Sequence, residues 1–258
     1  MKVVEYGEKQ PQVVLLLHGG GLSWWSYREV AHRLQAHYHV VLPVLDGHAE
    51  SGVPFVSIEE NAARLIRYIE ERFGGAVLAA AGLSLGGQIL AEMLAERKWI
   101  CQYAVLESAL VVPMRMTGAC VGPIVRASYG LIRKMWFAKM QARALGIPES
   151  MFADYYRDTC ALRETDMIRF MQANAGYQMK EGLADTSARV LVVAGGKERR
   201  EIRRSALLLH SAIPNSRLWI PAHYKHGACS LRHPQLYAET LHAWIEGGVL
   251  PKVGETEI

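Results

Sequence analysis

Residues 76–87 of the chain read AVLAAAGLSLGG, and residues 88–98 continue as a helix-forming stretch. The apolar first half is typical of a buried strand, and the second half contains the pattern Gly82-x-Ser84-x-Gly86. A strand, a sharp turn around a serine and a helix together indicate a nucleophile elbow, in which small residues let strand and helix approach closely. We predict that Ser84 lies on a strained turn at a helix N-terminus, where free N–H groups can stabilise an oxyanion. A purely structural turn is the alternative.

The bulk composition is that of an ordinary globular protein. The chain has 258 residues, of which 50% are hydrophobic and 21% are charged, and its formal net charge is +4. This length favours one large core, and so small a net charge does not indicate a nucleic acid partner. We expect neither a signal sequence nor a membrane span, because no stretch is long and apolar enough. The four scattered cysteines are expected to be free thiols, which indicates a cytoplasmic protein.

Short apolar runs alternate with helical patterns along most of the chain. The expected strands cover residues 13–17, 39–44, 76–81, 103–107, 189–194 and 217–220, and a short N-terminal strand covers about 2–6. The expected helices cover residues 25–36, 58–73, 88–98, 201–212 and 234–246. Strands that are apolar throughout are covered on both faces, and this alternation predicts right-handed crossovers. The predicted fold class is α/β, with a doubly wound and mostly parallel central sheet.

One segment, residues 111–185, interrupts this alternation and contains no convincing strand. Helical patterns cover residues 124–144, 149–163 and 165–174. We predict a core domain from residues 1–110 and 186–258, with residues 111–185 as a helical lid over the carboxyl ends of the strands, where open α/β sheets bind ligands. The lid core is expected to hold its methionines, Met114, Met116, Met135, Met140, Met167, Met171 and Met179. Its basic residues are expected to be solvated, with an acidic substrate as the alternative.

Three histidines follow the last expected strand and compete for the role of general base, which a serine nucleophile requires. His226 precedes Gly227, so its loop can turn tightly and aim the ring back at the elbow. His223 lies closer to the strand end and is the second choice. His233 adjoins the final helix, where a capping or surface role is expected. We therefore predict His226 as the base.

Two carboxylates compete for the role of the group that orients the histidine. Glu198 lies in the loop after residues 189–194, so it should reach the same edge of the sheet as Ser84. Its structural alternative is a solvated charge at the start of a basic helix. Glu107 ends the expected strand over residues 103–107 and is a real competitor. We predict Glu198 as the acid.

The first central strand is followed by His18-Gly19-Gly20-Gly21. Glycines there let backbone N–H groups approach a developing oxyanion without a side chain in the way. The two predicted donors are the N–H of Gly20 and the N–H of Leu85. For His18 we expect a structural role, as an imidazole that braces the loop.

These residues together resemble the α/β-hydrolase superfamily, of the capped serine esterase, lipase and lactone-hydrolase type. The resemblance covers nearly the whole chain. It rests on His18-Gly19-Gly20-Gly21 with Trp24 and Trp25, Asp46-Gly47-His48, Gly82-Leu83-Ser84-Leu85-Gly86-Gly87, Gly195-Gly196-Lys197-Glu198, and His226-Gly227 with His233-Pro234. One departure is the acid, because similar proteins more often carry Asp there than Glu.

The resemblance implies an acyl-serine intermediate that is hydrolysed by a histidine-activated water, without a metal or organic cofactor. It also implies that Ser84 is the nucleophile, His226 the base and acid, and Glu198 the orienting carboxylate, with Gly20 and Leu85 as oxyanion donors. The predicted substrate is a small ester, lactone or thioester with an apolar portion. The alternatives are a lyase, a carbon–carbon bond hydrolase or a cofactor-free peroxidase with the same triad, and a non-catalytic receptor of the same fold.

Overall fold

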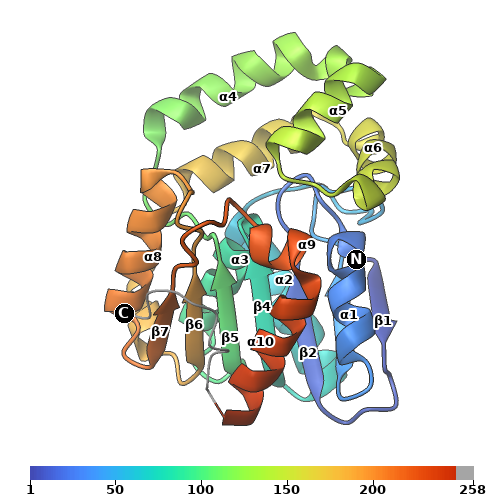
Figure 1. Ribbon diagram of the computed structural model, residues 1–258. Helices are drawn as coiled ribbons and strands as arrows, with labels where there is room; N and C mark the ends of the chain where they lie inside the picture. Colours follow the sequence, from blue (N-terminus) through green and yellow to red (C-terminus); the bar gives the residue numbers. More distant parts are fainter. Residues whose placement is uncertain (248–258) are drawn as a thin grey trace.

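The fold is built on one seven-stranded sheet, seen in a computed structural model that describes residues 1–247 (Figure 1). The strands run in the spatial order β1-β3-β2-β4-β5-β6-β7, and all adjacent pairs are parallel except β1 with β3. Their bounds are β1 Val3–Tyr6, β2 Val13–Leu17, β3 His39–Pro43, β4 Val77–Leu83, β5 Cys101–Glu107, β6 Arg189–Val193 and β7 Ser216–Trp219. The predicted fold class, an α/β fold with a mostly parallel sheet, is confirmed.

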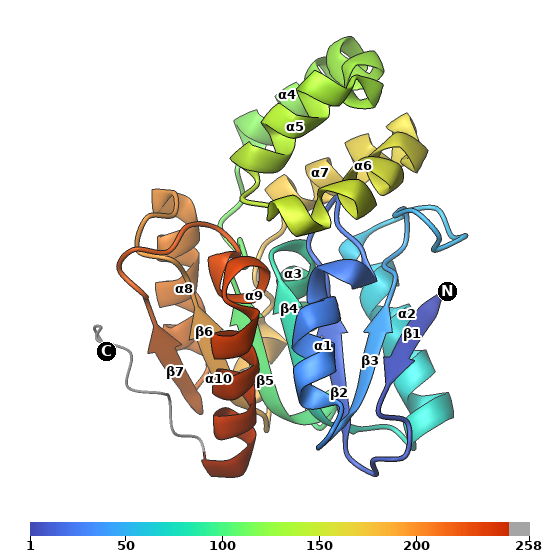
Figure 2. The ribbon, with the colours of Figure 1, turned by 45° about the vertical axis from the view of Figure 1, so that its right-hand side comes forward.

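Helices cover both faces of the sheet, as the apolar strands require. α1 (Arg28–Leu34) and α10 (Pro234–Gly247) pack on one face, and α2 (Ile58–Phe73), α3 (Leu85–Glu96) and α8 (Arg200–Ala212) pack on the other (Figures 1 and 2). Alternate residues of a strand point to opposite faces. The side chains of β2 therefore divide between the two cores, with Leu15 and Leu17 in one and Val14 and Leu16 in the other. Short elements at the sheet edge are η1 (Trp24–Tyr27), which leads into α1, and α9 (Ala228–Arg232), which precedes α10.

The helix α2 has the bounds that its sequence pattern predicts. Ser57 caps its start, because the Ser57 hydroxyl accepts a hydrogen bond from the Glu60 N–H at 3.1 Å. Gly74 ends it in the left-handed conformation, with φ of 71°. A clear apolar stripe between two standard caps is the most readable signal a helix can have.

Four helices and three short 3-10 segments are inserted between β5 and β6, and the helices form two tiers (Figure 2). The inner tier, α6 (Phe152–Ala161) and α7 (Glu164–Gly176), lies next to the sheet end. It is preceded by η3 (Glu149–Met151). The outer tier comprises α4 (Arg115–Ser128), η2 (Tyr129–Arg133) and α5 (Met135–Ala144), and it lies beyond the inner tier. After the inner tier, η4 (Glu181–Asp185) packs against α3 of the core.

The insertion enters and leaves through one narrow neck. The Met114 N–H, just before α4, donates a hydrogen bond to the Ala175 carbonyl near the end of α7, at 2.7 Å. On the α3 side of the neck, Asn174 Nδ2 donates to Gln88 Oε1 at 2.8 Å, and Gln88 Nε2 donates to the Asn174 carbonyl at 2.9 Å. The two chain crossings are thus fixed to each other and to α3.

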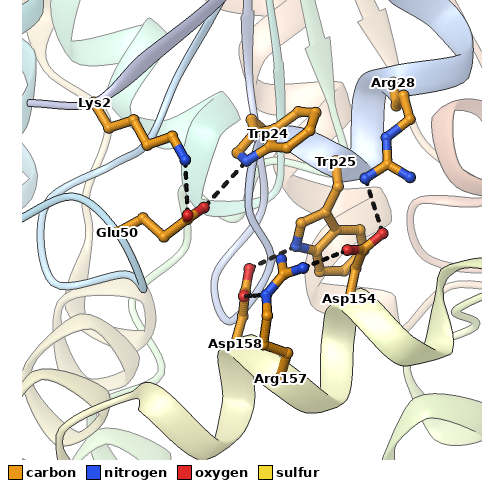
Figure 3. Close-up of polar contacts among 8 residues, drawn as sticks. All are labelled: Lys2, Trp24, Trp25, Arg28, Glu50, Asp154, Arg157 and Asp158. Carbon is orange, nitrogen blue, oxygen red and sulfur yellow. Dashed lines mark hydrogen bonds and ion pairs between the residues drawn. The ribbon is translucent and has the colours of Figure 1, made fainter.

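Polar contacts tie the inner tier to η1 and α1, as Figure 3 shows. Asp158 of α6 is buried and accepts a hydrogen bond from the Trp25 indole at 2.7 Å. Asp154 of the same helix pairs with Arg28 at 2.9 Å, and Arg157 pairs with both aspartates at 2.7 Å. Trp25 is itself almost fully buried, so its hydrogen bond joins two buried side chains that are more than a hundred residues apart in the sequence. We call the contacts among Trp25, Arg28, Asp154, Arg157 and Asp158 the latch of the inner tier.

The expected bounds of the first helix of the insertion are wrong. The pattern over residues 124–144 predicted one helix, but α4 begins at Arg115 and the chain turns extended at Lys134 (ψ of 123°) before α5. The Ser128 hydroxyl donates to the Ile124 carbonyl at 2.8 Å, and such back-bonding bends helices and offers the chain an alternative to helix at this point. Pro123 lies inside α4, and because proline is disfavoured within helices, the sequence pattern did not predict the part of α4 before it.

The sequence analysis expects the methionines of the insertion to be core residues, but four of them are not. Met116, Met135, Met140 and Met171 are exposed, and Met116 is 87% exposed. For Met116 the reason is that α4 buries little: a small cluster of Val121, Val125 and Ile168 is all that joins it to α7 as a buried apolar core within residues 1–247.

Candidate active site

The elbow around Ser84 is a strained turn at the sheet edge. Ser84 has φ of 52° and ψ of −111° between β4 and α3, and its N–H donates to the Glu107 carbonyl at 2.8 Å. A Cβ at Gly82 would lie 2.3 Å from the Gly86 carbonyl oxygen, and one at Gly86 would lie 2.2 Å from the Leu17 oxygen. Strain of this kind persists only where surrounding contacts over-determine it, and it is common at active sites. Both flanking glycines are therefore required by close backbone approach.

His226 and Glu198 meet at the same edge. His226 Nδ1 lies 2.7 Å from Glu198 Oε2, so the two groups that follow β7 and β6 form the pair that the sequence analysis predicts. The other carboxylate oxygen, Oε1, accepts hydrogen bonds from the Ser108 hydroxyl and from the Gly195 N–H, each at 2.7 Å. The carboxylate is buried, whereas the imidazole is partly exposed. Because Nδ1 is engaged, Nε2 is the ring atom left to exchange a proton.

Ser108 is a site residue that the sequence analysis did not find. It lies directly after β5 with φ of 56°, a left-handed conformation that is uncommon outside glycine. Its hydroxyl donates to Glu198 and accepts from the Gly227 N–H at 3.3 Å, so one side chain joins the loops of acid and base. The available signal was its position: a polar residue at the carboxyl end of a central strand, beside the Glu107 that was considered.

The other candidates for the acid and the base do not form this carboxylate–imidazole pair. Glu107 makes no hydrogen bond to His226 within residues 1–247, and its Oε1 instead accepts from the Ser230 N–H at 3.3 Å. Burial raises the pKa of Glu107 to about 7. His223 is exposed, and the ring of His233 stacks on Tyr224 at 4.5 Å between centroids. Among the candidates, the structure brings Glu198 and His226 together.

The predicted oxyanion donors lie on either side of the elbow. Leu85 is the first residue of α3, and Gly20 lies in the loop after β2. Within the described residues, neither N–H donates to a protein acceptor, so both remain available to a ligand. A Cβ at Gly20 would touch the Phe170 ring of α7 at 3.4 Å, so the inner tier closes over this loop.

Two buried histidines brace the Gly20 loop. His18 Nε2 accepts from the Leu45 N–H at 3.1 Å, which confirms the expected bracing role, and His48 Nε2 accepts from the Gly21 N–H at 3.0 Å. Accepting at Nε2 requires neutral rings. Burial lowers the pKa of His48 to about 4 and the pKa of His18 well below its usual value. His48 also stacks on Phe170 at 4.8 Å, so it joins the loop to the inner tier.

A cavity of about 440 Å³ connects these groups. Ser84, His226, Glu198, Gly20 and Leu85 all line it. Its apolar wall includes Leu22, Leu83 and Leu110 from the core, Phe170 from the inner tier, and Val121 and Leu145 from the α4 and α5 segments. A cavity of this size with an apolar wall and a few convergent polar groups is the usual form of a small-molecule site.

Comparison with known proteins identifies the family of the chain. A model of the alpha/beta hydrolase family matches residues 14–240. The chain belongs to the α/β hydrolase family. A search of curated protein sequences gave no match.

Solved structures of several enzymes share the fold. An esterase from Exiguobacterium antarcticum matches with a TM-score of 0.80 at 19% identity, over 95% of each chain. A thermophilic esterase from Thermogutta terrifontis matches with a TM-score of 0.73 at 17% identity, over 95% of this chain and 92% of that one. A bromoperoxidase from Bacillus anthracis matches with a TM-score of 0.76 at 17% identity, over 95% and 94%. At these identities the likeness concerns the fold, and the reaction must be argued from the site.

This α/β hydrolase offers no obvious metal centre in the part of the chain that the structure describes. No group of three or more His, Cys, Asp or Glu side chains there is arranged to hold an ion. None of the four cysteines, Cys101, Cys120, Cys160 and Cys229, forms a disulfide in this part of the chain. None of the described helices is both long and apolar enough to cross a bilayer.

Proposed function

We propose that the chain is a serine hydrolase that cleaves a carboxylic ester, lactone or thioester through an acyl-serine intermediate. The observation that carries this proposal is the Glu198–His226 pair, which opens onto the same cavity as the strained Ser84. A buried carboxylate that holds the Nδ1 side of an imidazole beside an elbow serine is the arrangement that activates a hydroxyl for acyl transfer.

The first half of the reaction forms the acyl-enzyme. His226 Nε2 takes the proton of Ser84 Oγ as the oxygen attacks the substrate carbonyl, and the N–H groups of Gly20 and Leu85 receive the resulting oxyanion. His226 then gives the proton to the leaving alcohol, thiol or ring oxygen, and the carbonyl reforms on Ser84. Without substrate, no hydrogen bond joins Ser84 to His226 in the described part of the chain, and such contacts often tighten only in the substrate complex.

The second half releases the acid. His226 takes a proton from a water molecule, which attacks the acyl carbon of Ser84 through a second oxyanion at the same N–H groups. Collapse of this intermediate returns the proton from His226 to Ser84 Oγ and frees the carboxylic acid. Throughout, Glu198 keeps His226 in the tautomer that carries its hydrogen on Nδ1.

The substrate class follows from the cavity wall. Apolar side chains dominate the wall, which favours a small substrate with an apolar acyl or alcohol portion. Residues 111–185 act as the cap that encloses this portion, because α7 and the α4 and α5 segments supply part of the wall. The cytoplasmic location predicted from the sequence remains a prediction.

Labelling with a fluorophosphonate probe tests the proposed function directly. The expected result is one adduct on Ser84, located by mass spectrometry, that disappears in Ser84→Ala. An unlabelled, folded protein would overturn the proposal and favour a receptor of the same fold.

The assignment of the acid has its own test. Glu198→Gln should lower turnover of a soluble ester by on the order of 10²–10⁴, because the imidazole loses its orienting charge. Glu107→Gln is the matched control, since it changes another buried carboxyl, at the end of β5, and should retain most activity. If Glu107→Gln abolishes activity and Glu198→Gln does not, the two roles are reversed.

A further inference from the structure

Positive charge is concentrated in one part of the chain. Residues 108–148 contain six Lys or Arg residues and no Asp or Glu, whereas the remaining residues sum to a formal charge of −2. The six are all exposed, and none pairs with a carboxylate within residues 1–247: Arg115, Arg126, Arg133, Lys134, Lys139 and Arg143. The outer tier is therefore a cationic surface on a molecule that is otherwise slightly acidic.

Large apolar side chains are exposed on the same surface. Of the twelve large hydrophobic side chains exposed in the described residues, six lie in the outer tier: Met116, Ile124, Leu131, Met135, Trp136 and Met140. Trp136 and Ile124 are 63% and 62% exposed, and Met140 is 51% exposed. Large apolar side chains exposed in this number within one segment indicate an interaction site.

The helix α4 shows how this surface is organised. Its exposed residues Met116, Cys120, Pro123, Ile124 and Ala127 have the spacing of one helix face. The other side of the helix carries the buried residues that pack on α7. Thus α4 is apolar on two sides, one against the protein and one against solvent, and its arginines flank the solvent side.

The helix α5 adds an aromatic residue to the same pattern. Trp136 and Met140 are one turn apart, and so are the neighbouring Lys139 and Arg143, all four being exposed. Tryptophan is the side chain that most favours the interface between lipid and water, and long basic side chains reach headgroup phosphates while their stems cover apolar surface.

We propose that the outer tier is a docking surface for anionic phospholipid bilayers. The apolar side chains of α4, η2 and α5 enter the interfacial region, and the six cations face the phosphates, as in other amphipathic helices that lie on membranes. Figures 1 and 2 show that α4 and α5 form the end of the molecule farthest from the sheet, so the core does not obstruct a flat surface.

Charge decides between a bilayer and a second copy of the chain. A two-fold dimer through this face would bring the same six cations together without acidic partners, because an isologous contact pairs a patch with itself. A nucleic acid would satisfy the cations but leave the exposed apolar side chains unused. An anionic bilayer satisfies both, and this docking does not depend on the reaction proposed at Ser84.

Vesicle flotation of the full chain tests the proposal, and Ser84→Ala keeps the test independent of catalysis. The expected result is binding to phosphatidylglycerol vesicles, little binding to phosphatidylcholine vesicles, and weaker binding as salt is raised. The variant with Arg133→Gln, Lys134→Gln and Lys139→Gln should bind on the order of 100-fold more weakly, at about fivefold for each cation.

The matched control removes three exposed cations from another face of the molecule. Arg200→Gln, Arg203→Gln and Arg204→Gln on α8 change the net charge equally and should bind almost as the parent does. Circular dichroism verifies that both triple variants fold. Equal losses in the two variants, or no binding to either vesicle, would overturn the proposal. So would a dimer in sedimentation that the outer-tier variant abolishes, because a second copy would then occupy this face.

Cys120 allows the depth of docking to be measured. It lies in the middle of the exposed stripe of α4, whereas Cys101 and Cys229 are buried and Cys160 is half-buried. A polarity-sensitive fluorophore on Cys120, in a Cys160→Ser background, should shift to shorter wavelength with phosphatidylglycerol vesicles. An unchanged spectrum on vesicle-bound protein would show that another face makes the contact, which contradicts the proposal.

Discussion

The two tiers of the insertion are attached to the molecule in different ways. The inner tier is held by directional contacts between buried groups, such as the hydrogen bond from Trp25 to Asp158 and the ring stacking of His48 on Phe170. The outer tier is joined by a small apolar cluster on α4, by the buried Ala142 of α5, and by hydrogen bonds from the Tyr129 and Tyr156 hydroxyls to backbone carbonyls, and it exposes many apolar side chains to solvent. The inner tier thus has one defined position over the site, whereas the outer tier has surface that its own chain does not cover.

The largest expected effect is at the latch of the inner tier. Asp158→Ala leaves the buried Trp25 N–H without an acceptor and should lower the free energy of unfolding by about 3 kcal/mol. Arg157→Gln removes a partner whose side chain is exposed, and should cost less than about 1 kcal/mol. Denaturant unfolding of both variants makes the comparison. Equal losses would show that the ion pairs, and not the buried indole contact, hold α6.

The contact between the inner tier and the Gly20 loop should weaken in acid. The pKa of His48 is about 4 in the folded protein, below the value of about 6.5 in an unfolded chain. The unfolded state therefore binds the proton first as pH falls, so the stability contributed by neutral His48 is complete above pH 6.5 and is lost toward pH 4. By pH 5 the loss should be about 2 kcal/mol.

His48→Gln provides the control for this pH dependence. Its amide oxygen can still accept from the Gly21 N–H, but the side chain does not titrate. The variant should therefore lose less stability than the parent between pH 7 and pH 5, with His18 supplying the remaining acid sensitivity. Unfolding curves at the two pH values measure the difference. Parallel losses in parent and variant would mean that His48 does not couple acid to the loop.

The smallest effects are expected in the outer tier, where two adjacent residues form a matched pair. Val125 is buried against the inner tier, and Val125→Ala should cost about 1–2 kcal/mol of stability because two methyl groups leave the cluster. Ile124 points to solvent, and Ile124→Ala should change stability by less than about 0.5 kcal/mol. A large loss for Ile124→Ala would show that this face is covered in the free protein.

The sequence predicted the framework of the molecule well, because its signals are local. α2 has the predicted bounds, and the carboxyl ends of β4, β6 and β7 bring the elbow, Glu198 and His226 to one edge. What the sequence did not show depends on distant side chains. Ser108 contacts Glu198 across 90 positions, and its place after β5 indicates only that it lies at the sheet edge, not which side chain it contacts. The division of the insertion into two tiers could not be predicted either, because α4 is apolar on two sides and its sequence resembles that of a buried core helix.

The neck at Met114 and Ala175 bears on how such a protein can diversify. The insertion leaves and rejoins the core at two points that are hydrogen-bonded to each other, so all of α4 to α7 is covalently attached at a single junction. A segment from a related chain must match that junction and the inner-tier contacts with Trp25, Arg28 and His48 to be grafted, whereas the elbow, the acid and the base lie outside the exchanged part. Recombination at one place can therefore replace the roof of the cavity and the outer surface together while the reacting groups stay as they are.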